Sequence, residues 1–228
     1  MKLIRKIIGF IFLVLIIIIS VFIGIGYNMY KNALNKMPID MKIANIKQEK
    51  NYTTFEELPE TYINAVIAVE DHRFFKHKGV DYIAVARAIY NDIRSKELRE
   101  GGSSITQQLC KNIYFTQNRK LSRKIAETFM ALKVEKECSK EEIFELYVNT
   151  SYFGDGYYCI GDASQGYFNK EPIDMNIYEC TLLAGIPNAP SVYAPTKNLD
   201  LAEQRQRQVI NKMVEYNYLT IEEADNIR

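Results

Sequence analysis

The stretch that decides the fold covers residues 65–79 and reads AVIAVEDHRFFKHKG. Five apolar residues lead directly into two neighbouring carboxylates, Glu70 and Asp71, and the only two histidines of the protein follow. Pro59 suits the first turn of a helix, and the apolar residues after it cover more than one side of that helix. We therefore predict a buried helix that carries Glu70 into the interior.

Glu70 has two interpretations when only the sequence is considered. Burial disfavours the charged form of a carboxylate, and a carboxyl group in such a place is suited to general acid or base catalysis. Alternatively, Glu70 forms a structural ion pair with Arg73 at the end of the helix. The composition of the segment favours neither interpretation over the other.

The histidines and cysteines do not form a metal-binding pattern. His72 and His77 lie five residues apart, which does not place two ligands on one face of a helix, and the chain has no H-E-x-x-H motif. We interpret both histidines as structural or hydrogen-bonding residues. No C-x-x-C pair occurs, so a zinc site is not expected and free, mostly buried thiols are favoured over two disulfides. The four cysteines are Cys110, Cys138, Cys159 and Cys180.

The overall composition is that of a globular protein with almost no net charge. The 228 residues include 29 Lys and Arg against 28 Asp and Glu, a formal net charge of +1. This balance gives no general reason to expect nucleic acid as a partner. The length is sufficient for one domain after any targeting segment.

The N-terminus has the pattern of a membrane anchor. Residues 7–27 carry no charge and are mostly Ile, Leu, Val and Phe, and about 20 such residues are needed to cross a bilayer as a helix. Lys2, Arg5 and Lys6 precede the run and predict that the N-terminus lies inside. A cleaved signal peptide is the alternative, but the run is longer than the usual signal core of about 7–15 residues.

These features predict four segments along the chain. Residues 1–6 form a cytoplasmic N-terminus, residues 7–27 a transmembrane anchor, residues 28–50 a polar stalk, and residues 51–228 the extracellular or periplasmic domain. Within that domain nearly every segment has helical periodicity, and Ser139 with Glu142 forms a capping box before an apolar stripe. The predicted fold class is mainly α.

Basic residues gather in one part of this nearly neutral chain. Residues 94–124 contain eight basic side chains and two acidic ones. Ser103 and Ser104 follow two glycines and open a helix, whose free N–H groups and dipole can receive a phosphate or pyrophosphate. The alternative is an ordinary helix cap beside a solvated basic face. Glu127 follows Arg123 by four residues, a spacing that an ordinary surface ion pair also has.

Five segments in order resemble the motifs of the peptidoglycan glycosyltransferases, family 51. Ser104 stands where threonine is usual, and Asn169 replaces a usual glycine. No S-x-x-K motif occurs, so the chain resembles the monofunctional type without a transpeptidase domain, or a piece of a longer protein. The segments are residues 70–79 (EDHRFFKHKG), 101–108 (GGSSITQQ), 123–127 (RKIAE), 143–154 (IFELYVNTSYFG) and 183–195 (LAGIPNAPSVYAP).

The resemblance implies a fold and a reaction. The fold is mainly helical and lysozyme-like, with a cleft between a larger lobe and a small membrane-proximal lobe. The reaction joins lipid II units into β-1,4 glycan strands with inversion and releases undecaprenyl pyrophosphate. Lipid II, the growing glycan chain and the membrane are the implied partners, transpeptidases of wall synthesis are candidate partners, and moenomycin is the implied inhibitor.

The resemblance also implies roles for individual residues. Glu70 is the base that deprotonates the acceptor 4-hydroxyl, and Glu127 organises the donor phosphosugar. No prosthetic group is implied, but the resemblance allows for a Mg²⁺ or Mn²⁺ ion bound at the pyrophosphate. Neutralisation of the leaving pyrophosphate is assigned to Lys111, Arg119, Arg123 and Lys124, and orientation of the substrate to Ser103, Gln107 and Gln108.

Two other functions compete with polymerisation. A glycan-cleaving enzyme of similar fold also uses a glutamate, but it has no leaving phosphate and no need for the basic cluster. A catalytically inactive membrane scaffold would have lost the glutamate or the second motif, and the sequence retains both.

Overall fold

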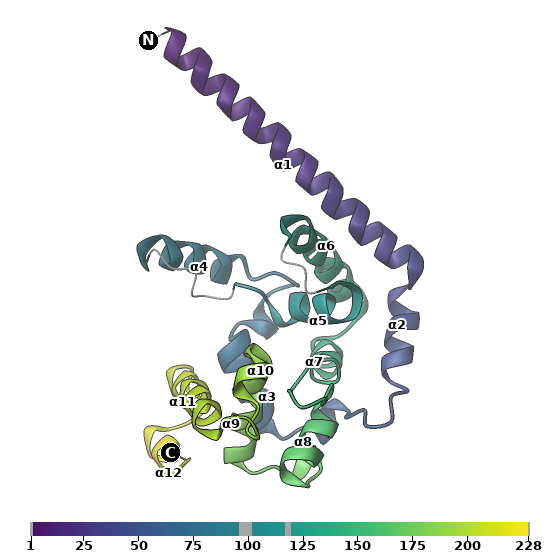
Figure 1. The fold of residues 1–228 in the computed structure, drawn as a ribbon, viewed down its shortest axis with the longest axis vertical. Helices are drawn as coiled ribbons and strands as arrows, with labels where there is room; N and C mark the ends of the chain where they lie inside the picture. Colours follow the sequence, from purple (N-terminus) through teal and green to yellow (C-terminus); the bar gives the residue numbers. More distant parts are fainter. Residues whose placement is uncertain (1, 96–101, 117–119, 228) are drawn as a thin grey trace.

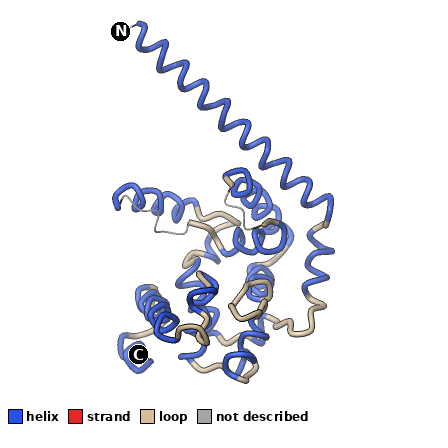
Figure 2. The backbone as a smooth tube through the Cα atoms, in the orientation of Figure 1, coloured by secondary structure: helices blue, strands red, loops and turns tan. Residues whose placement is uncertain are grey.

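The computed structural model describes residues 2–95, 102–116 and 120–227, and every regular element within these ranges is helical (Figure 2). An isolated bridge between Lys78 and Val80 is the only β-type pairing in the described part of the chain. The predicted mainly α fold class is confirmed. Figure 1 labels α1 (Lys2–Lys36), α2 (Ile39–Ile46), α3 (Glu60–Glu70), α4 (Tyr82–Ser95), α5 (Ile105–Tyr114), α6 (Leu121–Glu137), α7 (Lys140–Val148), α8 (Ile160–Phe168), α9 (Ile177–Gly185), α10 (Pro190–Tyr193), α11 (Leu199–Glu215) and α12 (Ile221–Ile227).

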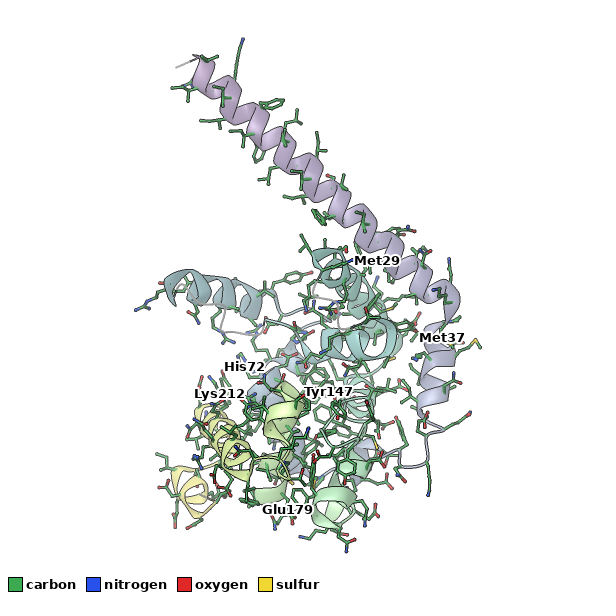
Figure 3. The ribbon with its side chains drawn as sticks, in the orientation of Figure 1. Met29, Met37, His72, Tyr147, Glu179 and Lys212 are labelled. Atoms are coloured by element: carbon green, nitrogen blue, oxygen red, sulfur yellow. The ribbon has the colours of Figure 1, made fainter. Side chains whose placement is uncertain are left out.

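Helix α1 stands away from the body of the molecule over most of its length (Figure 1). Its large apolar side chains from Leu3 to Ile25 are exposed on all sides, and none of its most apolar window is buried (Figure 3). A soluble helix would bury at least one apolar stripe. Among the described residues this is the one helix long and apolar enough to cross a membrane, in agreement with the predicted anchor.

The end of α1 packs tightly against α6. Gly26 is buried, and a Cβ atom at this position would lie 2.6 Å from the Ile125 side chain, so only glycine fits at this contact. Tyr27 and Tyr30 pack around Phe129, with ring centroids 5.3 and 5.9 Å from it. The membrane helix is therefore attached directly to α6.

Residues 28–50, predicted as a stalk, are helical over most of their length. They form the last part of α1 and all of α2, and Ile39 and Ile46 lie in the hydrophobic core. The hydroxyl of Tyr114 on α5 donates to the carbonyl of Met37, 3.2 Å away. This segment is thus packed against the domain as well as joining it to α1.

Helix α3 lies at the centre of the body, packed against α9 and α11. Tyr62 and residues 65–68 are buried, so apolar contacts surround the helix, as its sequence predicts. The helix ends at Glu70, because the backbone of Asp71 leaves the helical conformation, with a φ of −160° and a ψ of 74°. This termination places two carboxylates at the end of a rigid buried element.

Helix α6 packs against α1, and α5 packs against both α6 and α7. Gly79 has a φ of +84° in the turn before α4, and a Cβ atom there would lie 3.0 Å from the backbone of Ala131 on α6. Asn169, at the position where the resemblance leads us to expect glycine, ends α8 in the left-handed conformation with a φ of 54°. Asparagine tolerates this conformation better than most residues other than glycine. All four cysteines are free, and two of them are buried.

A variant lacking residues 1–24 is expected to stay folded and to lose most of its membrane attachment. It keeps Gly26, Tyr27 and Tyr30, which cover α6, but loses the exposed apolar length of α1. Flotation with liposomes measures attachment, and circular dichroism reports the fold. If the shortened protein floats as well as the full chain, another surface holds the domain at the membrane.

Candidate functional site

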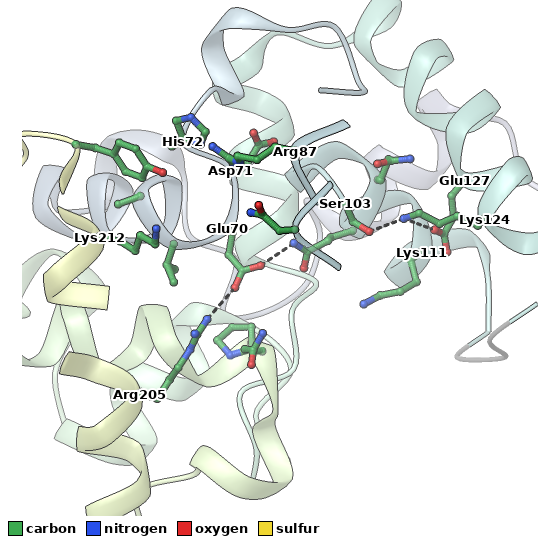
Figure 4. A pocket seen from close by; sticks show the side chains of 18 of the residues that line it. Glu70, Asp71, His72, Arg87, Ser103, Lys111, Lys124, Glu127, Arg205 and Lys212 are labelled. Carbon is green, nitrogen blue, oxygen red and sulfur yellow. Dashed lines mark hydrogen bonds and ion pairs between the residues drawn. The ribbon is translucent and has the colours of Figure 1, made fainter. Parts of the chain in front are cut away.

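A cleft of about 740 Å³ runs across the end of α3 and is lined by residues of α3, α4, α5, α6 and α11 (Figure 4). Nine residues are predicted from the sequence to form the site. The cleft brings together eight of them, namely Glu70, Ser103, Gln107, Gln108, Lys111, Arg123, Lys124 and Glu127. The ninth, Arg119, lies outside the described residues.

Glu70 lies in the middle of the cleft with its side chain only 11% exposed. Its Oε2 atom accepts a hydrogen bond from Gln108 Nε2 at 2.8 Å, and its Oε1 atom lies 3.6 Å from Nη2 of Arg205. Arg73, the alternative partner in the sequence, pairs with Asp81 at 3.0 Å, so that interpretation is wrong. Oε1 is buried and has no hydrogen-bond partner, which leaves its lone pairs free to accept a proton.

The neighbouring carboxylate, Asp71, is occupied by the protein itself. It accepts hydrogen bonds from His77 Nε2 at 2.9 Å and from the backbone N–H of Ile105 at 3.0 Å. These contacts join the end of α3 to the start of α5. Of the two adjacent carboxylates, Glu70 is therefore the one available for chemistry, and His77 has the structural role that its position in the sequence suggests.

Glu127 is buried, with an exposed fraction of 2%, between two cations of its own helix. It pairs with Arg123 through Oε1 and with Lys124 through Oε2, the latter at 3.2 Å. The helical spacing alone is equally compatible with an exposed ion pair, which would contribute little to the stability of the protein. Because this pair is buried, removal of one partner would leave the other as an uncompensated buried charge, which is strongly destabilising.

The two serines before α5 have different roles. Ser104 is the cap: its Oγ accepts from the backbone N–H of Gln107 at 3.1 Å and is itself buried. Ser103 lines the cleft, and its Oγ accepts a hydrogen bond from Lys124 Nζ. Gln107 completes the capping box and donates to Thr128 at 3.1 Å, so its amide is engaged within the protein.

Lys111 projects from α5 into the same end of the cleft as Ser103 and Lys124 (Figure 4). Burial lowers the pKa of its ammonium group, while the carboxylates of Glu127 and Glu70 act against that shift. Lys111 thus lies within electrostatic reach of both glutamates. Together with Arg123 and Lys124 it makes this end of the cleft cationic.

The other end of the cleft contains residues that were not predicted from the sequence to belong to the site. The ring of His72 stacks on Tyr216 with centroids 4.4 Å apart and planes at 8°, and burial lowers the pKa of His72. Lys212 and Arg87 line the same region. The residues from α11 and its end follow the last recognised motif, so no local signal indicated them.

Glu127 does not provide a metal site by itself. Mg²⁺ and similar ions need several oxygen ligands, and both oxygens of Glu127 already face cations. No group of three potential metal ligands occurs among the described residues.

The geometry suits a transfer reaction with an anionic leaving group. One buried carboxylate oxygen accepts no hydrogen bond, and the cations Lys111, Arg123 and Lys124 line the same cleft. Such cations stabilise charge that develops in the transition state without reorganising.

Known proteins are similar to this sequence over most of its length. Residues 39–214 match the family profile described as transglycosylase. Penicillin-binding protein 1A of Neisseria lactamica is 41% identical over 197 residues, covering 83% of this chain and 25% of that protein. The protein of the same name from Aquifex aeolicus is 40% identical over 178 residues, covering 78% and 24% respectively. The chain thus spans about a quarter of the length of these relatives.

A solved structure with some similarity is penicillin-binding protein 1A from Haemophilus influenzae. The match covers 79% of this chain and 17% of that chain, with a TM-score of 0.47 and 22% identity. This likeness is too weak to define the arrangement of the helices.

Proposed function

This chain belongs to the transglycosylase family, the peptidoglycan glycosyltransferases of family 51, and from that premise we propose that it polymerises lipid II. The product is a β-1,4 glycan strand formed with inversion, and undecaprenyl pyrophosphate is released. The observation that carries the proposal is the buried Oε1 of Glu70, which accepts no hydrogen bond and lies in the same cleft as the cations Lys111, Arg123 and Lys124.

The proposed step moves one proton and exchanges one bond. As the acceptor 4-hydroxyl attacks C1 of the donor sugar, its proton passes to Oε1 of Glu70. The bond from C1 to the phosphate oxygen breaks, and its electron pair leaves with the pyrophosphate. Lys111, Arg123 and Lys124 stabilise the negative charge on this leaving group.

Cleavage of a glycan by the same glutamate is the competing reaction. It releases a sugar hydroxyl and gives no use to a cluster of buried and half-buried cations. The position of Lys111, Arg123 and Lys124 in the same cleft as Glu70 therefore supports transfer from a pyrophosphate. A Mg²⁺ or Mn²⁺ ion would enter only with that pyrophosphate, and the proposed step does not pass through it.

We also propose the setting of the reaction. Lys2, Arg5 and Lys6 at the start of α1 favour an N-terminus in the cytoplasm and a domain on the outer side of the membrane, where the lipid-linked substrate would be presented. The growing glycan chain is the second substrate, and transpeptidases that cross-link it are the proposed partners.

Polymerisation is tested directly with labelled lipid II. Protein purified in detergent is expected to convert it into long glycan strands, sized by gel electrophoresis, and moenomycin is expected to block the conversion. If lipid II persists unchanged under conditions in which another family member polymerises it, the proposed function is wrong.

Glu127→Gln is expected to weaken the donor end of the cleft as well as the rate. The substitution removes the carboxylate that holds Arg123 and Lys124 in place, so we expect both cations to lose the orientation in which they bind an anion. Loss of a charged hydrogen-bond partner costs about 1.5–3 kcal/mol, so moenomycin should bind about tenfold more weakly or worse. Calorimetric titration with moenomycin measures this affinity. Unchanged affinity and rate would show that Glu127 has no part in donor binding.

A further inference from the structure

Arg205 reaches Glu70 from a part of the chain that none of the five motifs includes. It projects from α11, and its side chain is only 12% exposed (Figure 4). Its Nη2 atom lies 3.6 Å from Oε1 of Glu70, while Gln108 binds the other carboxylate oxygen. The carboxylate therefore has one hydrogen-bond donor and one cation, on different oxygens.

At its distance from Glu70, Arg205 can act through its charge but does not form a hydrogen bond. At 3.6 Å the guanidinium is beyond the usual hydrogen-bond range of about 2.7–3.2 Å. It is still close enough to stabilise a buried carboxylate by Coulomb attraction, which is strong away from water. Oε1 thus has a neighbouring cation and keeps its lone pairs, an arrangement suited to an oxygen that must accept a proton.

The path of the Arg205 side chain is fixed by its surroundings. Nη1 donates to Oε1 of Gln208 at 2.9 Å. On α9, Gly185 leaves room for the stem of the arginine, since a Cβ atom there would lie 2.8 Å from Arg205 Cγ. Helices α3, α9 and α11 pack on one another, so the cation and the carboxylate are held by the same core.

We propose that Arg205 is a positioning residue for the transfer reaction: it holds the Glu70 carboxylate in the orientation in which Oε1 receives the acceptor proton. This inference rests on the proposed function. Arg205 itself exchanges no proton, because a guanidinium stays protonated in proteins.

The test compares Arg205→Met, Arg205→Lys and the control Arg207→Met in lipid II polymerisation. Methionine keeps an aliphatic stem and removes the charge, whereas lysine keeps a charge. Arg207 is exposed on the same helix and does not line the cleft. Arg205→Met is expected to lower kcat by about 10²-fold, the loss that a misplacement of about 1 Å can cause. KM and moenomycin affinity should stay near wild type, and Arg205→Lys should restore much of kcat.

Gly185→Ala provides a second variant that retains every charge. The added methyl group pushes on the arginine stem at Cγ, and alanine is otherwise favourable in a helix. We expect kcat to fall while the thermal midpoint is maintained. If Arg205→Met fails to fold, this variant and Arg205→Lys decide the matter.

The outcomes separate this inference from the proposed function. Wild-type polymerisation together with an unchanged kcat in Arg205→Met and Gly185→Ala would overturn the role of Arg205 and leave the function standing. A fall in kcat that follows the thermal midpoint and is not restored by lysine would show a purely structural arginine. If wild-type protein does not polymerise lipid II, the proposed function fails first.

Discussion

Glu70→Gln is expected to lower the rate of lipid II polymerisation by about 10²–10⁴-fold, the usual contribution of a general base. Glutamine keeps the size of the side chain and can keep the contact with Gln108, but it offers no carboxylate oxygen as proton acceptor. A sugar hydroxyl is a poor nucleophile unless its proton is removed as it attacks. Because the cations that bind the donor are untouched, moenomycin should bind with nearly wild-type affinity.

The matched control is Glu60→Gln, at the exposed first residue of the same helix. It changes the same chemical group outside the cleft and should leave the rate unchanged. Single-turnover assays with labelled lipid II and titration with moenomycin separate chemistry from binding. If Glu70→Gln keeps more than about a tenth of the wild-type rate, which is outside the range for a general base, Glu70 is structural.

Lys111→Met is expected to lower kcat by about 10²–10³-fold, the loss observed when one stabiliser of a developing anion is removed. Lys111 is a partly buried cation within electrostatic reach of both Glu70 and Glu127. Methionine keeps most of the aliphatic stem, so packing against α6 should change little. The missing charge is felt most when the pyrophosphate leaves, and the effect should therefore be larger on kcat than on the thermal midpoint.

Lys50→Met provides the control, because Lys50 is exposed and does not line the cleft that contains Glu70. Steady-state rates over a range of lipid II concentrations give kcat and KM for both variants. Equal rates for the two would mean that the basic residues form only a solvated face. Such a result would remove the main argument for a pyrophosphate leaving group over glycan cleavage.

Local sequence was sufficient for the elements and for much of the site. The apolar residues before Glu70 predicted a buried helix, and α3 is buried at Tyr62 and residues 65–68. The charge-free run 7–27 predicted an exposed apolar helix, which α1 provides. The resemblance to the family identified eight of the residues that line the cleft, seven of them inside its motifs and Lys111 between two of them. Each of these features depends on periodicity or on short patterns that are encoded over a few turns of chain.

Local sequence patterns could not predict the burial and the ion-pair partners of Glu70 and Glu127. The same i, i+4 spacing suits a surface pair and a buried one, and only the packing of α5 against α6 buries Glu127. Arg73 is near Glu70 in sequence, yet it pairs with Asp81. Similarly, residues 28–50 are mostly polar in sequence, but Ile39 and Ile46 of this segment lie in the hydrophobic core.

The sequence by itself therefore determined the helical class, the membrane helix and the family, because these depend on local periodicity and on short motifs. Only the tertiary structure decided which cation faces Glu70. Arg205 lies far along the chain, and it reaches the carboxylate because α9 and α11 pack on α3 and Gly185 leaves space for its stem. Such a contact follows from the packing of three helices, and no pattern within one of them encodes it.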